Sequence, residues 1–562
     1  MKLLPVLTAL AVAGGAALSQ SFSAAAPFIN YRGVVNAASF EGQGLPGGSL
    51  AQGSIFTIFG SNLGPAQSVQ SSSYPLQTQL GGVSISVTQG SNTLAAIPIF
   101  VTASQVSAIM PSTAAVGQAI VTLSYNNQTS NPAIVNVVAA SPGIFSILSS
   151  GFGPGIVQNF VSQTNQPINT TQVTAQPGQT VILWGTGLGA VPYGDNVAPT
   201  PANLPTKVDV FVGNQPVTNL RYSGRSPCCA GLDQIVFDVP QNAPTGCYVP
   251  VQVRVNGAIV SNAVTIAIDK AGAACSDSFN PAGSAVRSGG NNGFISAIRS
   301  DTLDDTGADA PGDVTQDVLI ADLRQDAGGA TYFAPEYALP PVGACTMYSG
   351  KAFDNVASTM LFAPQSHPLD GGSALQVAAG GAPVEVGPAP GDSQLYGALL
   401  GEQPAVTGIP GLFFAFPGAF TVTISGGNDV KQAQVAGATP APMQWTNRAT
   451  LPTLNRAQGL TVTWTGGNPA TDVALIGIQA NNDAANSGAL ALCVAPVAAG
   501  TFSIPPEILA SLPATPASAV RVPAWVMVAS EPLLSPASFS ATGLQGGFLL
   551  PSYAAAKSVV VQ

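Results

Sequence analysis

The chain of 562 residues has a formal net charge of −10, yet only 7% of its residues are charged, against about 25% in an average soluble domain. It contains only 16 lysine and arginine residues, which argues against nucleic acid and anionic membrane surfaces as partners, because clustered basic residues bind phosphate groups. The single histidine, His367, leaves little of the usual repertoire for metal binding or acid–base catalysis.

Length and turn residues predict several all-β domains. A single hydrophobic core stops growing near about 250–300 residues, so this chain is long enough for three or four domains. Its 62 glycines and 47 prolines are scattered between alternating apolar segments, which is typical of short strands joined by turns.

The first 26 residues have the composition of a secretory signal peptide. Lys2 supplies the positive start, residues 3–17 are apolar, and the small residues 23–26 fit a cleavage site. A membrane anchor is the alternative, but the apolar run is shorter than the ~20 residues that a membrane span needs. We therefore expect residues 1–26 to be removed, and the mature chain to be secreted or held at the cell surface without a transmembrane segment.

Two stretches with nearly the same pattern predict a tandem repeat. Gly53-Ser-Ile-Phe-Thr-Ile-Phe-Gly-Ser-Asn-Leu-Gly64 returns as Gly178-Gln-Thr-Val-Ile-Leu-Trp-Gly-Thr-Gly-Leu-Gly189, 125 positions later. Residues 105–111 and Ser130-Asn131 then return, in the same order, as residues 234–240 and Ser261-Asn262. Each copy has roughly seven short strands, so we predict two immunoglobulin-like (Ig-like) β-sandwiches, at residues 30–140 and 141–272.

Further motifs within the repeats carry a family resemblance. They are Asn36-Ala-Ala-Ser39, Ser141-Pro-Gly-Ile-Phe145, Gly185-Thr-Gly-Leu-Gly189 and Tyr222-Ser-Gly. Over about residues 34–268 the chain resembles the uncharacterised paired domain of many secreted acidobacterial proteins, whose halves are similar to IPT/TIG-type Ig-like modules. The resemblance implies two sandwiches and supplies no catalytic residue. The pair usually lies near the C-terminus of a longer protein, whereas here it comes first.

The composition changes beyond residue 271. Residues 273–330 are polar and acidic, which predicts an exposed linker that ends in an edge strand near residues 318–323. Residues 331–562 again predict strands, in a β-sandwich region with one or two subdomains. Within it, residues 420–428 and 460–468 are near-copies, each a strand closed by a Gly-Gly turn.

Six cysteines fit an oxidising compartment. Six cysteines allow 15 pairings, and adjacent cysteines are poorly placed to bond to each other. We therefore expect disulfides between Cys229 and Cys247, between Cys228 and Cys275, and between Cys345 and Cys493. A zinc site is the alternative, but the sequence has no Cys-x-x-Cys pair.

Three groups of residues are candidates for a functional site. A calcium ion is bound by closely spaced carboxylates, and an acidic run could supply them, although a solvated linker is the favoured interpretation because the run lacks the spacing of a known loop. The run comprises Asp301, Asp304, Asp305, Asp309 and Asp313.

The second candidate has the residue types of a hydrolytic triad, Ser366, His367 and Asp370. Adjacent side chains of an extended segment point to opposite faces, which argues against a productive Ser366–His367 pair. The third candidate is Trp445, which has polar neighbours suited to a sugar-binding face, whereas a core position is the favoured interpretation. We expect no catalytic residue, no bound metal and no cofactor.

These observations favour a secreted, non-catalytic, multidomain β protein for extracellular binding, adhesion or surface architecture, with an extracellular protein or polysaccharide as its partner. One alternative is a polysaccharide-binding protein, for which exposed aromatic residues would be the sign. The other is an extracellular hydrolase with its site in residues 280–562, for which an Asp/Glu pair or an activated serine would be the sign.

Overall fold

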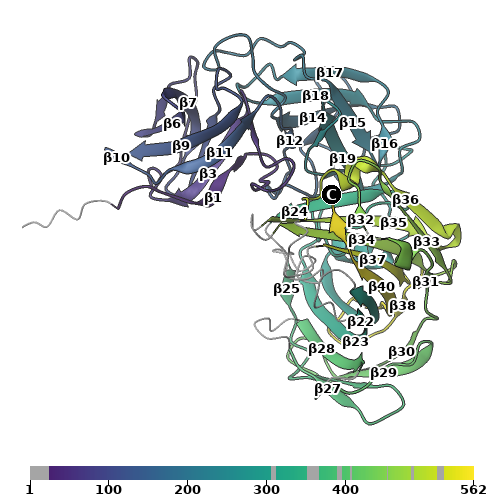
Figure 1. Cartoon of the computed structure of the whole chain (residues 1–562). Coiled ribbons are helices and arrows are strands. Elements are labelled where there is room, and N and C mark those ends of the chain that lie inside the picture. The colour runs from purple at the N-terminus through teal and green to yellow at the C-terminus, as the bar shows by residue number, and fades with distance from the viewer. Residues whose placement is uncertain are drawn as a thin grey trace, which may run out of the picture.

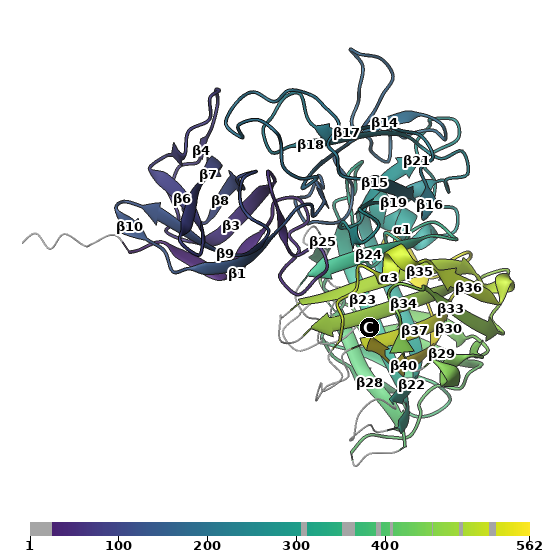
Figure 2. The ribbon, with the colours of Figure 1, turned by 45° about the horizontal axis from the view of Figure 1, so that its top comes forward.

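The computed structural model describes residues 25–304, 312–350, 366–388, 395–404, 408–451, 453–482, 487–515 and 524–562. These residues confirm the predicted fold class: the chain is all-β, with tandem Ig-like sandwiches followed by a larger β domain. In Figure 1 the first sandwich lies at the upper left, the second at the upper right, and the C-terminal domain below the second. The turned view of Figure 2 shows the same arrangement. Nearly all of the predicted signal peptide, residues 1–24, lies outside the described residues.

The first domain is a sheet folded onto itself around a core. Its strands are β1 (Phe28–Asn36), β2 (Leu50–Ala51), β3 (Ile55–Ser61), β4 (Val69–Gln70), β5 (Gln79–Leu80), β6 (Val83–Gln89), β7 (Asn92–Val101), β8 (Gln105–Ile109), β9 (Gly117–Tyr125), β10 (Gln128–Thr129) and β11 (Ala133–Val138). Hydrogen bonds connect most of them in the order β1-β3-β8-β7-β6-β9-β11-β2. The first half of β7 pairs with β6 and the second half with β8, so β7 passes from one layer to the other. Val83, Ile85 and Val87 point into the core between the layers, because alternate residues of a strand share a face.

The second domain consists of two separate sheets around one core. Its strands are β12 (Gly143–Ile144), β13 (Val157–Asn159), β14 (Thr180–Thr186), β15 (Val208–Val212), β16 (Gln215–Pro216), β17 (Leu220–Arg225), β18 (Asp233–Asp238), β19 (Gly246–Val255), β20 (Ile259–Val260) and β21 (Val264–Ile268). One sheet has the order β12-β14-β18-β17 with β13 beside β14, and the other has the order β16-β15-β19-β20 with β21 beside β19.

The repeat in the sequence is also a repeat in strand register. The two copies of the glycine-flanked motif form β3 and β14. β3 pairs with β8, which the repeated residues 105–111 supply, and β14 pairs with β18, which residues 234–240 supply. Phe59 lies opposite Gln105 in the first domain, and Trp184 lies opposite Gln234 in the second. The two motifs therefore occupy equivalent strands in two domains of the same design.

The repeated Ser-Asn dipeptide closes each domain in the same way. The amide of Asn131 both accepts from the backbone N–H of Ile29 and donates to its carbonyl, at 2.7 and 3.0 Å. The amide of Asn262 makes the same pair of bonds with Ile144, at 2.8 and 2.9 Å. Each Ser-Asn dipeptide thus ties the first strand of its domain to the strand that follows the dipeptide.

The C-terminal domain is built on one large sheet. Its elements are α1 (Pro281–Ser288), β22 (Gly290–Asp304), β23 (Gly312–Asp326), β24 (Cys345–Gly350), β25 (Ser366–Pro368), β26 (Leu375–Ala378), β27 (Val384–Val386), β28 (Leu395–Gln403), β29 (Gly418–Ile424), β30 (Ala433–Thr439), β31 (Gln444–Trp445), η1 (Arg448–Thr450), β32 (Thr453–Leu454), β33 (Leu460–Thr465), β34 (Val473–Asn482), β35 (Ser487–Pro496), η3 (Val497–Ala499), β36 (Thr501–Ile504), α3 (Pro506–Leu509), β37 (Ala524–Glu531), β38 (Ala537–Ser538), β39 (Gly546–Leu549), β40 (Ser552–Ser558) and β41 (Val560–Val561). The large sheet has the order β24-β35-β34-β37-β40-β22-β23-β25, with β28 on β23 and β39 on β22.

Two smaller sheets pack on one face of the large sheet, and α1 packs on the other. The sheet β27-β26-β29-β30 encloses one core with β22, β23 and β28. The sheet β31-β33-β36 encloses a second core with β34, β35 and β37. The near-copies at residues 420–428 and 460–468 supply β29 and β33, which each lie between two other strands of their small sheet.

The expected linker at residues 273–330 is wrong. β22 and β23 have 15 residues each and lie inside the large sheet. Leu319, Ala321 and Leu323 are buried in the core, while charged residues of the same two strands form ion pairs such as Arg299–Asp317, at 2.7 Å. The acidic composition suggested solvent exposure because the sequence does not show which charges meet across strands.

One expected disulfide is confirmed and two are wrong. Cys345 and Cys493 lie directly opposite each other on β24 and β35 and are bonded. Cys247 bonds to Cys275 and Cys228 bonds to its neighbour Cys229. Cys275 follows β21, which pairs with β19, so the chain brings it to within 5.2 Å of Cys247, Cα to Cα.

Candidate functional site

The structure places Trp445 in a core. Its side chain is 6% exposed and packs with Trp464, which lies opposite it in the neighbouring strand. The indole N–H donates to Asn447 Oδ1 at 2.7 Å, which satisfies its only polar group. The hypothesis that Trp445 forms a ligand face is therefore wrong, because Trp445 alternates with the polar residues that the sequence shows around it.

Two carboxylates of the acidic run lie close to one basic residue. Asp301 on β22 forms an ion pair with Arg448 at 3.1 Å and accepts from the Tyr553 hydroxyl at 3.3 Å. Asp313 on β23 lies 3.8 Å from the same guanidinium group. Asp304 is buried at the end of β22. The other two residues of the run, Asp305 and Asp309, lie outside the described residues. Within the described ranges, no three His, Cys, Asp or Glu side chains are grouped to hold a metal ion.

The residues of the suggested triad serve different parts of the structure. Ser366 and His367 are neighbours on β25, and the His367 side chain is exposed. The Asp370 carboxylate accepts from the backbone N–H groups of Asn428 and Gly372, at 3.0 and 2.9 Å. These bonds, first among them that from Asn428, lower the pKa of Asp370. Asp370 thus holds the Gly-Gly-Asn turn after β29 and does not orient His367.

A groove of about 410 Å³ lies where the two small sheets meet. It runs between the loops after β30 and β33, and its polar lining includes Asn468, Thr471 and Asp472. The Asp472 carboxylate already accepts three hydrogen bonds, from Asn468 N at 2.9 Å, Thr471 Oγ1 at 2.6 Å and Ser530 Oγ at 2.7 Å. These bonds fix the turn after β33, which has the same Gly-Gly-Asn sequence as the turn held by Asp370.

Glu531 is a second carboxyl group close enough to interact with Asp472, and sequence reasoning did not identify it. Burial raises the pKa of Glu531 to about 8, so the side chain is largely neutral at pH 7. Glu531 lies opposite Val473, whose side chain packs on the α1 side of the large sheet. Asp472 bonds to Ser530, and neighbouring strand residues point to opposite faces. The two carboxyl groups therefore do not converge on a common point.

A second group of buried charges lies between β23 and the segment after it. Arg324 contacts the carboxylates of Asp322 and Asp326 at 3.2 and 2.9 Å, and also that of Glu336. Burial raises the pKa of Asp322 and that of Glu336. The Tyr332 hydroxyl donates to Asp326 at 2.8 Å. These ionic contacts join β23 to the residues that cover the α1 face.

The repeated motifs themselves meet at the junction of the two Ig-like domains. The Thr186 hydroxyl, at the end of β14, accepts from the backbone N–H of Ile55, at the start of β3, at 2.8 Å. It donates to the Gly231 carbonyl at 2.7 Å. The Asp195 carboxylate accepts from both the backbone N–H and the hydroxyl of Ser112, at 2.8 and 2.6 Å. The junction therefore has directional bonds at more than one point.

An apolar cluster and a buried ion pair support this junction. Ile55, Ile97 and Ile109 of the first domain pack near residues of the 226–232 loop of the second, in one cluster. Next to them Arg225 and Asp233, 3% and 0% exposed, form an ion pair at 2.8 Å. Burial raises the pKa of Asp233 to about 6, although Arg225 and backbone N–H groups oppose the shift.

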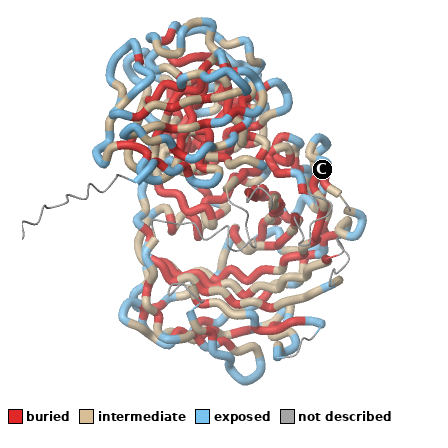
Figure 3. Tube along the Cα trace, turned by 60° about the vertical axis from the view of Figure 1, so that its left-hand side comes forward, coloured by how far each residue is buried: buried red, intermediate tan, exposed pale blue. Residues whose placement is uncertain are grey.

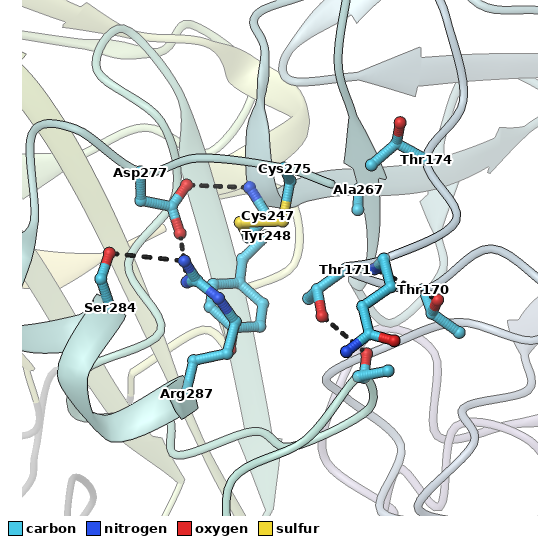
Figure 4. The surroundings of a disulfide bond; sticks show 12 residues. Thr170, Thr171, Thr174, Cys247, Tyr248, Ala267, Cys275, Asp277, Ser284 and Arg287 are labelled. Atoms are coloured by element: carbon cyan, nitrogen blue, oxygen red, sulfur yellow. Dashed lines mark hydrogen bonds and ion pairs between the residues drawn. A yellow bond between two sulfur atoms is a disulfide. The ribbon is translucent and has the colours of Figure 1, made fainter. Parts of the chain in front are cut away.

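The junction between the second domain and the C-terminal domain is organised around a disulfide (Figure 4). Cys247 bonds to Cys275, and the Asp277 carboxylate accepts from the backbone N–H of Cys247 at 2.8 Å. The same carboxylate forms an ion pair with Arg287 of α1 at 2.9 Å. Figure 4 shows Arg287 beside the ring of Tyr248. Burial raises the pKa of Tyr248 to about 12.

More polar and aromatic contacts cross this second junction. The Tyr248 hydroxyl donates to the Tyr332 carbonyl at 3.0 Å, and Asn214 accepts from the backbone N–H of Cys345 at 2.5 Å. The ring of Phe333 lies edge-on to that of Tyr248, with 5.5 Å between their centroids.

The described part of the chain contains no helix with the length and apolarity of a membrane span.

Comparisons with known proteins do not name a family. No protein-family model and no curated protein matches the chain. SGBP-B from a complex xyloglucan utilization locus in Bacteroides uniformis is 12% identical over 67% of this chain and 86% of its own, with a TM-score of 0.16. Domains 4–9 of the surface layer protein SbsC are 10% identical over 94% of this chain and 65% of their own, with a TM-score of 0.17. Titin domains A168–A170 are 7% identical over 72% of this chain and 93% of their own, with a TM-score of 0.13. At such scores these similarities carry no argument about function.

Proposed function

We propose that this chain is an extracellular, non-catalytic protein for binding or surface architecture, in which three β domains form one stiff unit. The observation that carries the proposal is the pair of junctions, which combine hydrogen bonds, apolar clusters and buried ion pairs. Domains that only share a linker move relative to each other by default, so junctions of this kind suit a role in holding binding surfaces at a fixed distance.

Export belongs to the same proposal. Residues 1–26 have the composition of a signal peptide, and three disulfides suit an oxidising compartment. N-terminal sequencing of the protein from a culture supernatant should give a mature chain that starts near residue 27. Retention of the intact N-terminus inside the cell would contradict export.

The stiffness can be measured by small-angle X-ray scattering of the mature chain. We expect a single maximum dimension that matches the arrangement in Figure 1. The variant Ser112→Ala/Thr186→Val removes polar contacts of the first junction and should broaden the distance distribution. The control Ser162→Ala changes an exposed loop of the second domain and should leave the distribution unchanged. A flexible wild-type chain would overturn the stiff unit.

Binding can be measured with labelled mature chain on isolated extracellular polymers and on whole cells. We expect retention that survives washing and no release of soluble fragments from the polymer. If hydrolysis is found, the variants Ser366→Ala and His367→Ala test the triad, because unchanged hydrolysis in both would remove it. Hydrolysis by the wild-type chain would itself refute the non-catalytic proposal.

A further inference from the structure

The first domain has almost no charge. Between Glu41 and Asp195 the sequence contains no Asp, Glu, Lys, Arg or His, and Arg32 is the only other charged residue of the domain. Glu41 is 5% exposed, and burial raises its pKa to about 7. The outer surface of this domain therefore carries hydroxyl and amide groups where most soluble domains carry charges.

One face of the domain is an array of such groups. It is the outward side of β7, β6, β9 and β11. In Figure 3, where this domain is turned towards the viewer, buried positions alternate with half-buried and exposed ones along the trace. Thr88 on β6 lies opposite Thr93 on one side and Ile120 on the other, and Ile120 lies opposite Ile134. This row therefore crosses four strands, about 4.8 Å apart. The other outward positions are Ser84, Ser86, Ala95, Gln118, Thr122, Ser124 and Asn136.

The row ends in a hollow of about 220 Å³ beside β11. Gln43, Ser49, Gln118 and Asn136 line it with amides and a hydroxyl, and Ile134 forms part of its wall. Ile134 is 57% exposed. The hollow thus offers apolar and uncharged polar groups side by side.

An exposed aromatic ring stands beside this hollow. Tyr31 is 79% exposed, the most exposed of the large hydrophobic residues in the described part of the chain. The guanidinium of Arg32 lies 5.1 Å from the centre of its ring and donates to the Gln43 carbonyl at 3.2 Å. Gln43 in turn donates to the Ile134 carbonyl. These contacts connect the ring to the hollow and the hollow to the face formed by β7, β6, β9 and β11.

We propose that Tyr31, the hollow beside β11 and the row through Ile134 and Ile120 form a binding surface for an uncharged polysaccharide. This inference rests on the proposed extracellular binding role and names the partner. Hydroxyl and amide groups both donate and accept hydrogen bonds, so they can pair with sugar hydroxyls in either direction. Sugar rings also have apolar faces, which fit the isoleucines and the tyrosine ring.

Charge decides between this partner and a protein. An average soluble domain has about 25% charged residues, and apart from Arg32 this surface has no charge, so most charges pressed against it would lose water without gaining an ion pair. A second copy of the chain would bring no charges. However, the core of a stable homodimer interface is strongly apolar, and this face offers two isoleucines and one alanine among hydroxyls and amides.

The test uses the intact mature chain in affinity gel electrophoresis with a panel of neutral polysaccharides: a β-glucan, an α-glucan, a galactomannan and a xylan. Polygalacturonate serves as the acidic comparison. At least one neutral polymer should retard the chain, and the affinity should change less than about twofold between 0.05 and 0.5 M NaCl, because no ion pair contributes.

The variants Tyr31→Ala and Ile134→Glu should each weaken this retardation at least about tenfold, the second because a carboxylate would be buried without a partner. Ile168→Glu makes the same change at a position of the second domain that is 40% exposed, and it should bind like the wild type. Unchanged thermal unfolding of the three variants shows that they fold.

Four results would overturn the proposal. They are no retardation by any neutral polymer, full binding by both surface variants, salt-dependent binding to polygalacturonate alone, and a dimer in sedimentation that Ile134→Glu dissociates. The last result would assign the face to a second copy of the chain. If the surface variants are still retained on cells, only this surface fails, and the proposed binding role stands.

Discussion

The two Ig-like domains hold the same turn by different means. In the first domain the backbone N–H of Leu63 donates to the Ala103 carbonyl at 2.9 Å. In the second domain the equivalent N–H, that of Leu188, donates to the carboxylate of Asp233 at 2.8 Å. A backbone carbonyl thus does in one copy what a buried carboxylate does in the other.

The carboxylate brings a requirement that the carbonyl does not have. Asp233 is 0% exposed, so it needs Arg225 as a counter-charge, and removing one partner of a buried ion pair leaves an uncompensated charge. The second domain is therefore sensitive to single substitutions and to pH at a place where the first is not. The same turn can be held without charge, and the first domain, with only Arg32 and Glu41, has a nearly neutral surface.

Among the variants that test this comparison, Arg225→Met should cause the largest loss of stability. It leaves Asp233 buried without a partner, which should lower the free energy of unfolding of the second domain by about 3–5 kcal/mol. Denaturant unfolding followed by the fluorescence of Trp184 on β14 measures this. Arg221→Met is the matched control, because its ion pair with Asp238 involves a side chain that is 52% exposed, and we expect little change in stability, since solvent screens exposed ion pairs.

The double variant Arg225→Met/Asp233→Leu separates the ion pair from the packing. Without either charge the site resembles that of the first domain, and most of the lost stability should return. If the single variant Arg225→Met were as stable as the wild type, the buried Asp233 carboxylate would not need Arg225 as its counter-charge, and this interpretation would be wrong.

A smaller difference in stability is expected between variants of the two Ser-Asn dipeptides. Asn262→Ala should destabilise its domain by about 2–3 kcal/mol, because the buried amide bonds Ile144 and also donates to the Gly151 carbonyl at 2.7 Å. Asn131→Ala should cost about 1 kcal/mol, because Asn131 is exposed and water can replace it. Equal losses measured by denaturant unfolding of the two variants would contradict this difference in burial.

The tandem repeat could be predicted because both copies keep the residues that a strand and its turn require. Matching glycines and the Ser-Asn dipeptide give the order of strands. The structure adds the register, in which Phe59 and Trp184 occupy equivalent positions of the two domains. How the copies meet could not be predicted. Thr186 is part of the repeated motif, but its bond to Ile55 depends on the angle between two domains, which no local pattern encodes.

The C-terminal domain was harder to predict because its signals are non-local. β22 and β23 contain aspartates that resemble a solvated segment until their partners are known, and these partners include Arg448, which is 147 positions from Asp301. The exposed surface on the first domain was missed for a different reason. Its residues are ordinary in type, and only long-range contacts, such as that of Gln43 with the Ile134 carbonyl, bring Tyr31, Gln43 and Ile134 to one place.

A pH-dependent effect concerns the one acidic residue of the first domain. Burial raises the pKa of Glu41 from 4.5 to about 7, so the folded state binds more protons than the unfolded state between these values. Stability from this site is full below pH 4.5 and declines as the pH rises towards 7. Glu41→Gln keeps the neutral form, so the variant and the wild type should melt together at pH 4, whereas at pH 8 the variant should be more stable by about 3 kcal/mol. Differential scanning calorimetry at both pH values measures this, with Glu385→Gln, an exposed position, as the control. For Asp233 the same reasoning gives a window from 3.8 to about 6, and for Glu531 a window from 4.5 to about 8, so the part of the decline from pH 6 to 7 that is lost in Glu41→Gln belongs to Glu41.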